Sequence, residues 1–501
     1  MDASPDRDET ATEWSYSRRL SELAAAEPDR PALVVAGGPE LTRAQLDRRA
    51  NQVARLLADL GVGEGDLVTI AYPNGVDFVA TTIACWRLGA VPQPVSSRLP
   101  DLELAAIVEL AQPKVVAGVA EGRVVGVAQL PERLADDLGT DDGPLPDAVS
   151  PAWKAPTSGG STGRPKLIVS GAPSIWRLGE GDGLGYRDGG CLVMPGPLYH
   201  NGPFVWSFRA LLTGATVVLD TRFDAARTLE LIERHRGEVV YLVPTMMHRI
   251  WRLDPAEREA YDVSSLTTVW HLAAPCPAWL KEAWIDWLGP EVIMELYGGT
   301  EGQAATTIRG DEWLAHRGSV GRPIFGEIVI VDPEGNEVPR REVGEVAMRI
   351  GGGAPATYRY IGAEIRRVRD DWESLGDMGW MDEDGYLYLE DRQSDMILSG
   401  GANIYPAEVE AAIEGVDGVM SSCVIGLPDD ELGNRVHAIV QAAPGTDEDA
   451  LREALIAHLA ERLVRYKIPR TFELVDHPLR DDAGKVRRSA LRAERIAAAT
   501  A

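Results

Sequence analysis

The chain has 501 residues, which corresponds to about three domains at roughly 150 residues each. Its 50 lysines and arginines against 77 aspartates and glutamates give a net charge of −27, so most of the surface repels a phosphate backbone or an anionic lipid. This arithmetic excludes a peptide, a disulfide miniprotein and a lone binding module. It also argues against nucleic acid or a membrane as a partner.

The cysteines and the first residues indicate a reduced, cytoplasmic protein. Cys85, Cys191, Cys276 and Cys423 are widely spaced and form neither a C-x-x-C pair nor a metal-binding cluster with histidine. Residues 1–15 are acidic and polar, unlike the basic and apolar start of a signal peptide. No run approaches the ~18 apolar residues that a membrane helix requires.

Apolar spacing predicts alternating helices and strands along most of the chain. Residues 41–60 have apolar side chains at helical intervals, and the apolar run Leu67–Tyr72 that follows is typical of a buried strand. Further strands are expected over Thr216–Leu219, Val239–Val243, Thr267–Ala273 and Val292–Tyr297, and further helices over Ala225–His235 and Met246–Leu253. This alternation predicts an α/β fold with a largely parallel sheet.

The pattern changes near residue 386. Asp384-Gly385 lies between the apolar runs Met378–Met381 and Tyr386–Leu389, which predicts a hairpin, and the charged stretch 391–395 that follows indicates a linker. The remaining elements suffice for a small α+β domain. Its expected helices are Pro406–Ile413 and Glu448–Leu463, and its expected strands are Ser422–Leu427, Val436–Gln441 and Thr471–Val475.

The strongest chemical signal is the segment TSGGSTGRPK at 157–166. It combines three glycines, four hydroxyl side chains and a lysine, the groups that bind a polyphosphate. It does not fit the Walker A pattern. A flexible surface linker is the alternative, but the apolar residues 167–169 that follow favour a defined loop that enters a strand.

Two further segments place polar groups where α/β proteins bind ligands. In ELYGGTEG, at 295–302, Tyr297 offers a stacking face and Glu301 a carboxylate for Mg²⁺; a plain turn with a solvated glutamate is the alternative. Asp377 can accept both hydroxyls of a ribose, and Arg392 adds donors. An Asp-Arg pair at a domain joint, however, is usually a structural salt bridge.

Two cationic or titratable side chains are ambiguous by themselves. Lys485 follows a glycine near the C-terminus and can reach across a cleft, although a basic start of a helix is more often a solvated face. His200, in PLYHNGPF, is by itself more typical of a core or loop histidine. The pattern H-E-x-x-H does not occur, so zinc hydrolysis lacks its motif.

The order of these segments resembles the adenylate-forming superfamily of acyl-CoA synthetases, nonribosomal-peptide adenylation domains and luciferases. The resemblance covers nearly the whole chain and includes GSVGRP, LGDMGWMDEDGYLYLEDR, SGGANIYPAEVE, YKIPR and AGK. The extra glycine of SGGSTGRPKLI, together with PLYHNGPF and EWLAHRGSVG, is similar to bile-acid and other bulky-carboxylate CoA ligases. Ala273 and Ala274 depart from a more glycine-rich family segment.

The resemblance implies a large N-terminal domain of packed α/β subdomains over residues 1–391, a hinge at 392–394 that includes Ser394, and a small mobile C-terminal domain over 395–501. The implied nucleotide-binding residues are Thr157, Ser158, Gly160, Ser161, Thr162, Gly163, Lys166, Ala274, Tyr297, Asp377 and Arg392.

The same resemblance implies catalytic and substrate-binding roles. Glu301 would coordinate Mg²⁺, Thr300 would contact the α-phosphate, and Lys485 would reach the carboxylate and the α-phosphate. Gly400 and Gly401 would line the path of the pantetheine arm of coenzyme A. The implied acyl-site residues are His200, Asn201, Gly298 and Gly299.

The implied activity is ATP-dependent conversion of a bulky hydrophobic carboxylic acid (polycyclic, terpenoid, steroidal or aryl) to an acyl-adenylate, and then to a CoA thioester. Three alternatives stay open: thioesterification alone, on an acyl-adenylate from a partner enzyme; loading of a carrier protein; and a non-catalytic nucleotide-binding subunit. The acidic pair Asp481-Asp482 lies just before Lys485, and its negative charge opposes engagement of an anionic nucleotide by the lysine. This pair prompts the first alternative, thioesterification alone. A homodimer is also left open.

Overall fold

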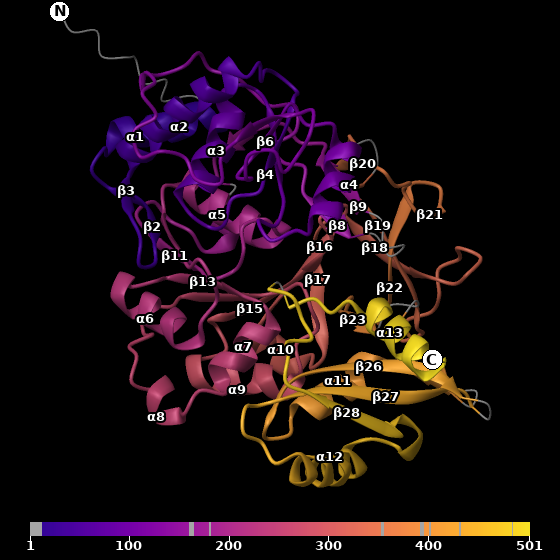
Figure 1. Cartoon of the computed structure of the whole chain (residues 1–501). Helices are drawn as coiled ribbons and strands as arrows, with labels where there is room; N and C mark the ends of the chain where they lie inside the picture. The colour runs from indigo at the N-terminus through magenta and orange to yellow at the C-terminus, as the bar shows by residue number, and fades with distance from the viewer. Residues whose placement is uncertain are drawn as a thin grey trace, which may run out of the picture. The chain divides into compact units, whose positions relative to one another are not determined.

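The computed structural model describes residues 13–159, 165–179, 182–351, 355–390, 395–399, 402–429, 432–482 and 484–500. The chain forms two compact units (Figure 1). The first comprises residues 1–241, 262–267 and 353–365, and the second comprises residues 242–261, 268–352 and 366–501. Within the described ranges, no helix is long and apolar enough to cross a membrane.

The first unit is built on two sheets that are mainly parallel. One has the order β5-β4-β6-β7, and the other β13-β11-β12-β2-β3, in which only β3 runs antiparallel to its neighbour. Two smaller antiparallel sheets have the strand orders β20-β9-β8 and β1-β10. The strands are β1 Glu13–Ser15, β2 Pro31–Val35, β3 Glu40–Thr42, β4 Leu67–Ile70, β5 Val91–Pro94, β6 Val115–Ala117, β7 Ala128–Leu130, β8 Thr157–Gly159, β9 Pro165–Ser170, β10 Ile175–Arg177, β11 Cys191–Met194, β12 Thr216–Leu219, β13 Val239–Leu242 and β20 Tyr358–Ile361.

Local sequence signals fix the helices of this unit. Helix α2 begins after Thr42, where Thr42 and Gln45 each accept a hydrogen bond from the other's backbone N–H in a capping box. Helix α6 begins after Asp224, whose carboxylate accepts from the N–H of Arg227. The helices are α1 Tyr16–Ala26, α2 Arg43–Asp59, α3 Val76–Arg87, α4 Asp101–Ala111, α5 Asn201–Thr213 and α6 Ala225–His235.

The second unit contains a long mixed sheet in the order β18-β19-β22-β23-β17-β16-β15-β14. Its pairs are antiparallel except for β14 and β15, which are parallel. The strands are β14 Thr268–His271, β15 Ile293–Gly298, β16 Ala305–Arg309, β17 Ser319–Phe325, β18 Glu327–Val331, β19 Gly344–Arg349, β21 Arg367–Arg369, β22 Trp372–Met381 and β23 Leu387–Glu390. The helices here are α7 Pro244–Trp251, α8 Pro255–Arg258, α9 Ala278–Leu288 and α10 Gly310–Ala315.

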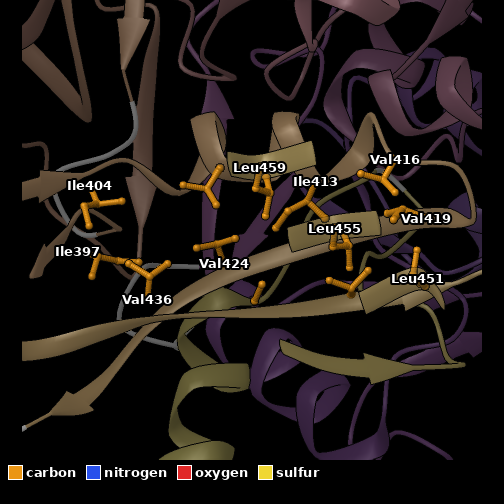
Figure 2. Close-up of a cluster of buried hydrophobic side chains, with 13 residues drawn as sticks. Ile397, Ile404, Ile413, Val416, Val419, Val424, Val436, Leu451, Leu455 and Leu459 are labelled. Carbon is orange, nitrogen blue, oxygen red and sulfur yellow. The ribbon is translucent and has the colours of Figure 1, made fainter. Parts of the chain in front are cut away.

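The C-terminal part of the second unit is a three-stranded sheet with buried side chains on both faces. Val424 of β26 packs with side chains of α11 and α12 on one face (Figure 2). Its neighbours Cys423 and Ile425 pack on the other face, toward α13. This period-2 alternation sets the two layers. The elements are β24 Ile397–Ser399, β25 Ala402–Ile404, α11 Pro406–Glu414, β26 Val419–Asp429, β27 Gly433–Ala442, α12 Glu448–Arg462, β28 Thr471–Val475 and α13 Arg488–Thr500.

The α/β fold expected from the sequence is confirmed. The largely parallel sheet is found only in the first unit, because the strand pairs of the long sheet in the second unit are antiparallel except for β14 and β15. The predicted helices at 225–235 and 406–413 and the strand at 216–219 agree with α6, α11 and β12 to within a residue. The hairpin at Asp384-Gly385 also forms, because Met381 pairs with Leu387 across the turn. Several predicted strands are longer or shorter at their ends, as for β26, which extends beyond the predicted 422–427 in both directions.

Candidate active site

The glycine-rich segment in the first unit is flanked by two paired strands. Thr157 of β8 lies opposite Leu167 of β9, and Ser158 lies opposite Lys166. Gly160, Ser161, Thr162 and Gly163 lie outside the described residues. The predicted entry of this segment into a strand is therefore confirmed, and its start and end are held by backbone pairing rather than left as free chain.

Buried polar contacts hold the first residue of this hairpin. The Thr69 hydroxyl donates to Oε1 of Gln93, and Nε2 of Gln93 donates to the Thr157 hydroxyl over 3.0 Å. Thr69 and Gln93 are fully buried. On the next strand, the Lys166 ammonium lies 4.0 Å from the centre of the Tyr360 ring, a cation–π contact that orients the lysine. Sequence reasoning missed Gln93 and Tyr360, which no local motif marks.

His200 is the N-cap residue of α5, and its ring lies 4.3 Å from that of Tyr199. The next residue, Asn201, accepts a hydrogen bond through Oδ1 from the ammonium of Lys154, a side chain that is nearly buried. Because the lysine occupies the amide oxygen, the other end of the Asn201 amide is a donor. Lys154 is a third residue that the sequence did not single out.

In the second unit, β15 and β22 bring two predicted residues, Tyr297 and Asp377, into contact. The Tyr297 hydroxyl donates to Oδ2 of Asp377 over 2.8 Å. Directly after β15, Gly299 begins a turn in which the N–H of Gly302 donates to the Gly299 carbonyl. Thr300 and Glu301 are the central residues of this turn, and Glu301 is 6% exposed.

Packing explains the glycines at 298 and 299. A Cβ on Gly299 would lie 2.5 Å from Cδ1 of Leu375 and 2.9 Å from Oε2 of Glu301, and one on Gly298 would lie 3.1 Å from Cβ of Ala305. Protein atoms thus already occupy the space beside both residues. The glycines bring β15, β22 and the Glu301 carboxylate close together.

The strand before the predicted adenine-binding segment ends in a strained turn. Ala273 follows β14 and has φ +74, a left-handed conformation that glycine adopts more readily. This is the segment in which alanines replace the family's glycines, so Ala274 is presented by a backbone that carries local strain.

Lys485 is the last residue of a tight turn between β28 and α13, which begins at Asp481. The Asp481 N–H donates to the Lys485 carbonyl over 2.8 Å, and the Lys485 N–H donates to the Asp481 carboxylate over 2.9 Å. Gly484 has φ +74, which the turn requires. One of the two acidic residues before the lysine therefore shapes the turn that presents it. Asp482 and Lys485 are both exposed.

Several predicted residues fall outside the described ranges. They are Arg392, Ser394, Gly400 and Gly401, and the linker at 391–394 lies there too. Nearby, Ser399 of β24 pairs with Ala402 of β25.

A carboxylate for Mg²⁺ is available in the second unit. Among the residues that the structure describes, no cluster of three or more histidine, cysteine or acidic side chains could hold a metal ion by itself. Mg²⁺ usually takes one or two carboxylates together with substrate phosphates, so the single Glu301 fits that mode.

Burial makes the four cysteines poor nucleophiles. It raises the pKa of the Cys191 and Cys423 thiols to about 12, and it raises the pKa of Cys85 and Cys276 further. All four are free thiols. Burial therefore disfavours the thiolate form of these cysteines at pH 7.

Comparison with known proteins identifies the fold and chemistry. Residues 20–355 match the AMP-binding enzyme family, and residues 408–485 match the AMP-binding enzyme C-terminal domain. The chain is an adenylate-forming acyl-CoA ligase.

Relatives of this ligase span nearly its whole length. It is 35% identical to a feruloyl-CoA synthase of an Amycolatopsis species, over 91% of this chain and 94% of the relative. It is 30% identical to a methyl-dioxo-octahydroindenyl-propanoyl:CoA ligase of Rhodococcus jostii, over 94% and 97%. The structure of an anthranilate CoA ligase in complex with anthranoyl-AMP has the same fold, with a TM-score of 0.83, 23% identity and coverage of 98% and 99%.

Membership of this family also indicates the reactants of the ligase. ATP, a small-molecule carboxylic acid and coenzyme A are the reactants of the family.

Proposed function

We propose that the ligase activates a bulky hydrophobic carboxylic acid, of the polycyclic, terpenoid, steroidal or aryl kind, as its acyl-adenylate and then transfers the acyl group to coenzyme A. The convergence of Tyr297, Asp377 and Glu301 at the end of β15 supports the nucleotide-binding half. Relatives that act on feruloyl and octahydroindenyl acids support a ring-bearing substrate.

The first step joins two anions. A carboxylate oxygen attacks the α-phosphorus of ATP, the bond to the β-phosphate oxygen breaks, and pyrophosphate leaves. Lys485 neutralises charge on the carboxylate and the α-phosphate, and Thr300 donates to the α-phosphate. Glu301 would hold Mg²⁺, which neutralises the phosphates when bound.

We assign separate groups to the phosphates, the base and the ribose of the nucleotide. The hydroxyls and glycines of residues 157–163 and the Lys166 ammonium bind the β- and γ-phosphates. Tyr297 stacks on adenine beside Ala274, and Asp377 with Arg392 binds the ribose. The Tyr297 hydroxyl donates to Oδ2 of Asp377, a contact that orients this carboxylate.

The second step uses a different face of the C-terminal domain. The thiol of coenzyme A attacks the acyl carbonyl and AMP leaves. Domains at 1–391 and 395–501, joined by a hinge with Ser394, allow Lys485 to withdraw and Gly400 and Gly401 to admit the pantetheine arm. We assign His200 to the position between the acyl pocket and the thiol path, and Asn201 and the backbone of Gly298 and Gly299 to the acyl site.

A pyrophosphate-release screen tests this proposal. Aromatic, fatty, steroidal and polycyclic terpenoid acids are each supplied with ATP and Mg²⁺, with and without coenzyme A, and thioester is measured in parallel. We expect release with ring-bearing acids and thioester only when coenzyme A is present. Preference for unbranched fatty acids would contradict the substrate assignment. Activity only on synthetic acyl-adenylates would instead support thioesterification alone.

A further inference from the structure

Helix α7 contacts the C-terminal part of its own unit at both ends. Just after the helix, Arg252 donates to the Asp417 carboxylate and to the carbonyls of Glu414 and Val416, over 3.2 and 3.0 Å for the two carbonyls. At the other end, Oγ1 of Thr245 lies 2.7 Å from the position that a Cβ on Gly484 would take. One short helix thus touches both the end of α11 and the turn that precedes Lys485.

The end of α11 is itself linked to that turn. The Glu414 carboxylate, near the C-terminus of α11, accepts from the backbone N–H of Ser422 over 3.0 Å and pairs with Arg480 at 3.4 Å. Arg480 in turn donates to the Gly484 carbonyl over 3.2 Å. A continuous series of contacts therefore runs from Arg252 through Glu414 and Arg480 to the residue before Lys485 (the loop between β28 and α13 in Figure 1).

Neighbouring side chains also hold the Arg252 guanidinium in place. Its Nε donates to Nε2 of His248 over 3.3 Å, and its guanidinium lies 5.9 Å from the Trp279 ring. Burial and the neighbouring guanidinium lower the pKa of His248 to about 4, so the ring is a neutral acceptor at pH 7. The Asp417 side chain is 99% exposed, so this ion pair contributes little by itself. The carbonyls at the end of α11 are the stronger partners, because a cation is stabilised there.

We propose that Arg252 is a positioning residue for acyl-adenylate formation, which holds the Lys485 turn through α11 and Arg480. The inference rests on the proposed function, in which Lys485 acts in the first step alone. Thioesterification does not use Lys485, so loss of Arg252 affects the first half-reaction selectively.

The test compares Arg252→Ala and Arg252→Lys with the matched control Arg341→Ala. Arg341 belongs to the same unit and forms an exposed ion pair with Glu383 at 2.7 Å. In Arg252→Ala we expect acid-dependent pyrophosphate release to fall at least about tenfold. Thioester formation from synthetic acyl-adenylate and coenzyme A stays at the wild-type rate. The lysine variant recovers part of the loss, and the control changes neither rate.

A second measurement does not depend on activity. Amide hydrogen exchange of the peptide 476–487 should be faster in Arg252→Ala than in the wild type or in Arg341→Ala. Unchanged exchange, or an equal fall in both half-reactions, overturns the inference. If the wild-type protein releases no pyrophosphate with any acid, the proposed function fails, while the exchange data still accept or reject anchoring of the turn by Arg252.

Discussion

The hydrogen bond from the Tyr297 hydroxyl to Asp377 joins two strands that are not neighbours in their sheet. Three strands, β16, β17 and β23, lie between β15 and β22 in the order of hydrogen bonding. At about 4.8 Å per strand, a flat sheet would separate β15 and β22 by roughly 19 Å. The 2.8 Å contact therefore requires a strongly curved sheet, and this curvature brings together the two side chains that we propose bind adenine and ribose.

Replacement of Tyr297 by phenylalanine tests this contact. The variant keeps the ring for stacking but leaves Asp377 without the hydroxyl that orients it. We expect the KM for ATP to rise about tenfold, since a hydrogen bond to a charged group contributes about 1.5 kcal/mol or more, while kcat changes little. Steady-state pyrophosphate release at varied ATP measures both constants.

Tyr388→Phe is the matched control for this experiment. Tyr388 lies on β23 and donates to Oδ2 of Asp382 over 3.3 Å, so the substitution removes a similar Tyr–Asp bond in the same unit. An equal change in the KM for ATP in both variants would show that the effect is not specific to Asp377.

The sequence predicted the local features of the site but not its long-range contacts. Tyr297 and Asp377 are each marked by a local motif, whereas their mutual contact depends on the curvature of a sheet with three intervening strands. Helix α6 was predictable to the residue because its cap, Asp224, and its apolar stripe are both local signals. Gln93 could not be recognised, because its role comes from burial beside Thr69 and Thr157.

The backbone conformation at two positions could not be predicted from the sequence either. The substitution of alanine for glycine at Ala273 was visible in the sequence, but its φ of +74 follows from the turn after β14. Similarly, Asp481 was interpreted as a charge that opposes Lys485, whereas the structure also uses its carboxylate to close the turn. Both observations depend on backbone geometry that composition does not encode.

Lys485→Ala separates the two half-reactions. The substitution removes the ammonium proposed to neutralise two anions in the first transition state, so we expect acid-dependent pyrophosphate release to fall by about 10²-fold or more, as for loss of a transition-state donor. Thioester formation from supplied acyl-adenylate should be largely retained. Asp482→Ala, two residues before the glycine, is a control for disturbance of the exposed turn. Pyrophosphate release at the wild-type rate would show that Lys485 has another role.

The buried ion pair between Lys281 and Glu295 predicts a large stability effect. The Lys281 ammonium pairs with Oε2 of Glu295, and its side chain is 1% exposed. Lys281→Met leaves an unpaired buried carboxylate, so we expect a loss of about 3–5 kcal/mol in the free energy of unfolding. The double variant with Glu295→Gln should be more stable than Lys281→Met alone. Denaturant titrations measure both, and additive losses would contradict coupling of the two side chains.

His271 predicts loss of stability in mild acid. It is fully buried, and burial lowers its pKa from 6.5 to about 4, with Lys281 acting in the same direction and Glu295 against it. Between pH 6.5 and 4 the unfolded chain binds more protons than the folded chain, so stability falls as the pH falls through this window.

We expect His271→Leu to remove that contribution. From pH 7 to pH 5 the wild type should lose about 2 kcal/mol more in the free energy of unfolding than the variant. Because His248 also has a pKa lowered to about 4, the variant keeps part of the pH dependence. Identical pH profiles for variant and wild type would exclude His271 as a contributor.

Two glycines of the segment GSVGRP provide a matched pair for the cost of a side chain. Both have positive φ, +88 for Gly318 and +95 for Gly321. A Cβ on Gly318 would meet nothing closer than Cδ1 of Tyr388 at 3.8 Å, whereas one on Gly321 would lie 1.9 Å from the backbone carbonyl oxygen of Thr307. Backbone strain is common to both sites, and the steric clash occurs only at Gly321.

Gly318→Ala should therefore cost only about 1–2 kcal/mol in the free energy of unfolding, the cost of an alanine at positive φ. Gly321→Ala must in addition separate β17 from β16, two strands that pair at Thr307 and Arg322. We expect at least about 2 kcal/mol more, measured by denaturant titration, or loss of soluble protein. Equal stability of the two variants would show that the sheet relaxes at Gly321 without cost, because only the clash distinguishes the two sites.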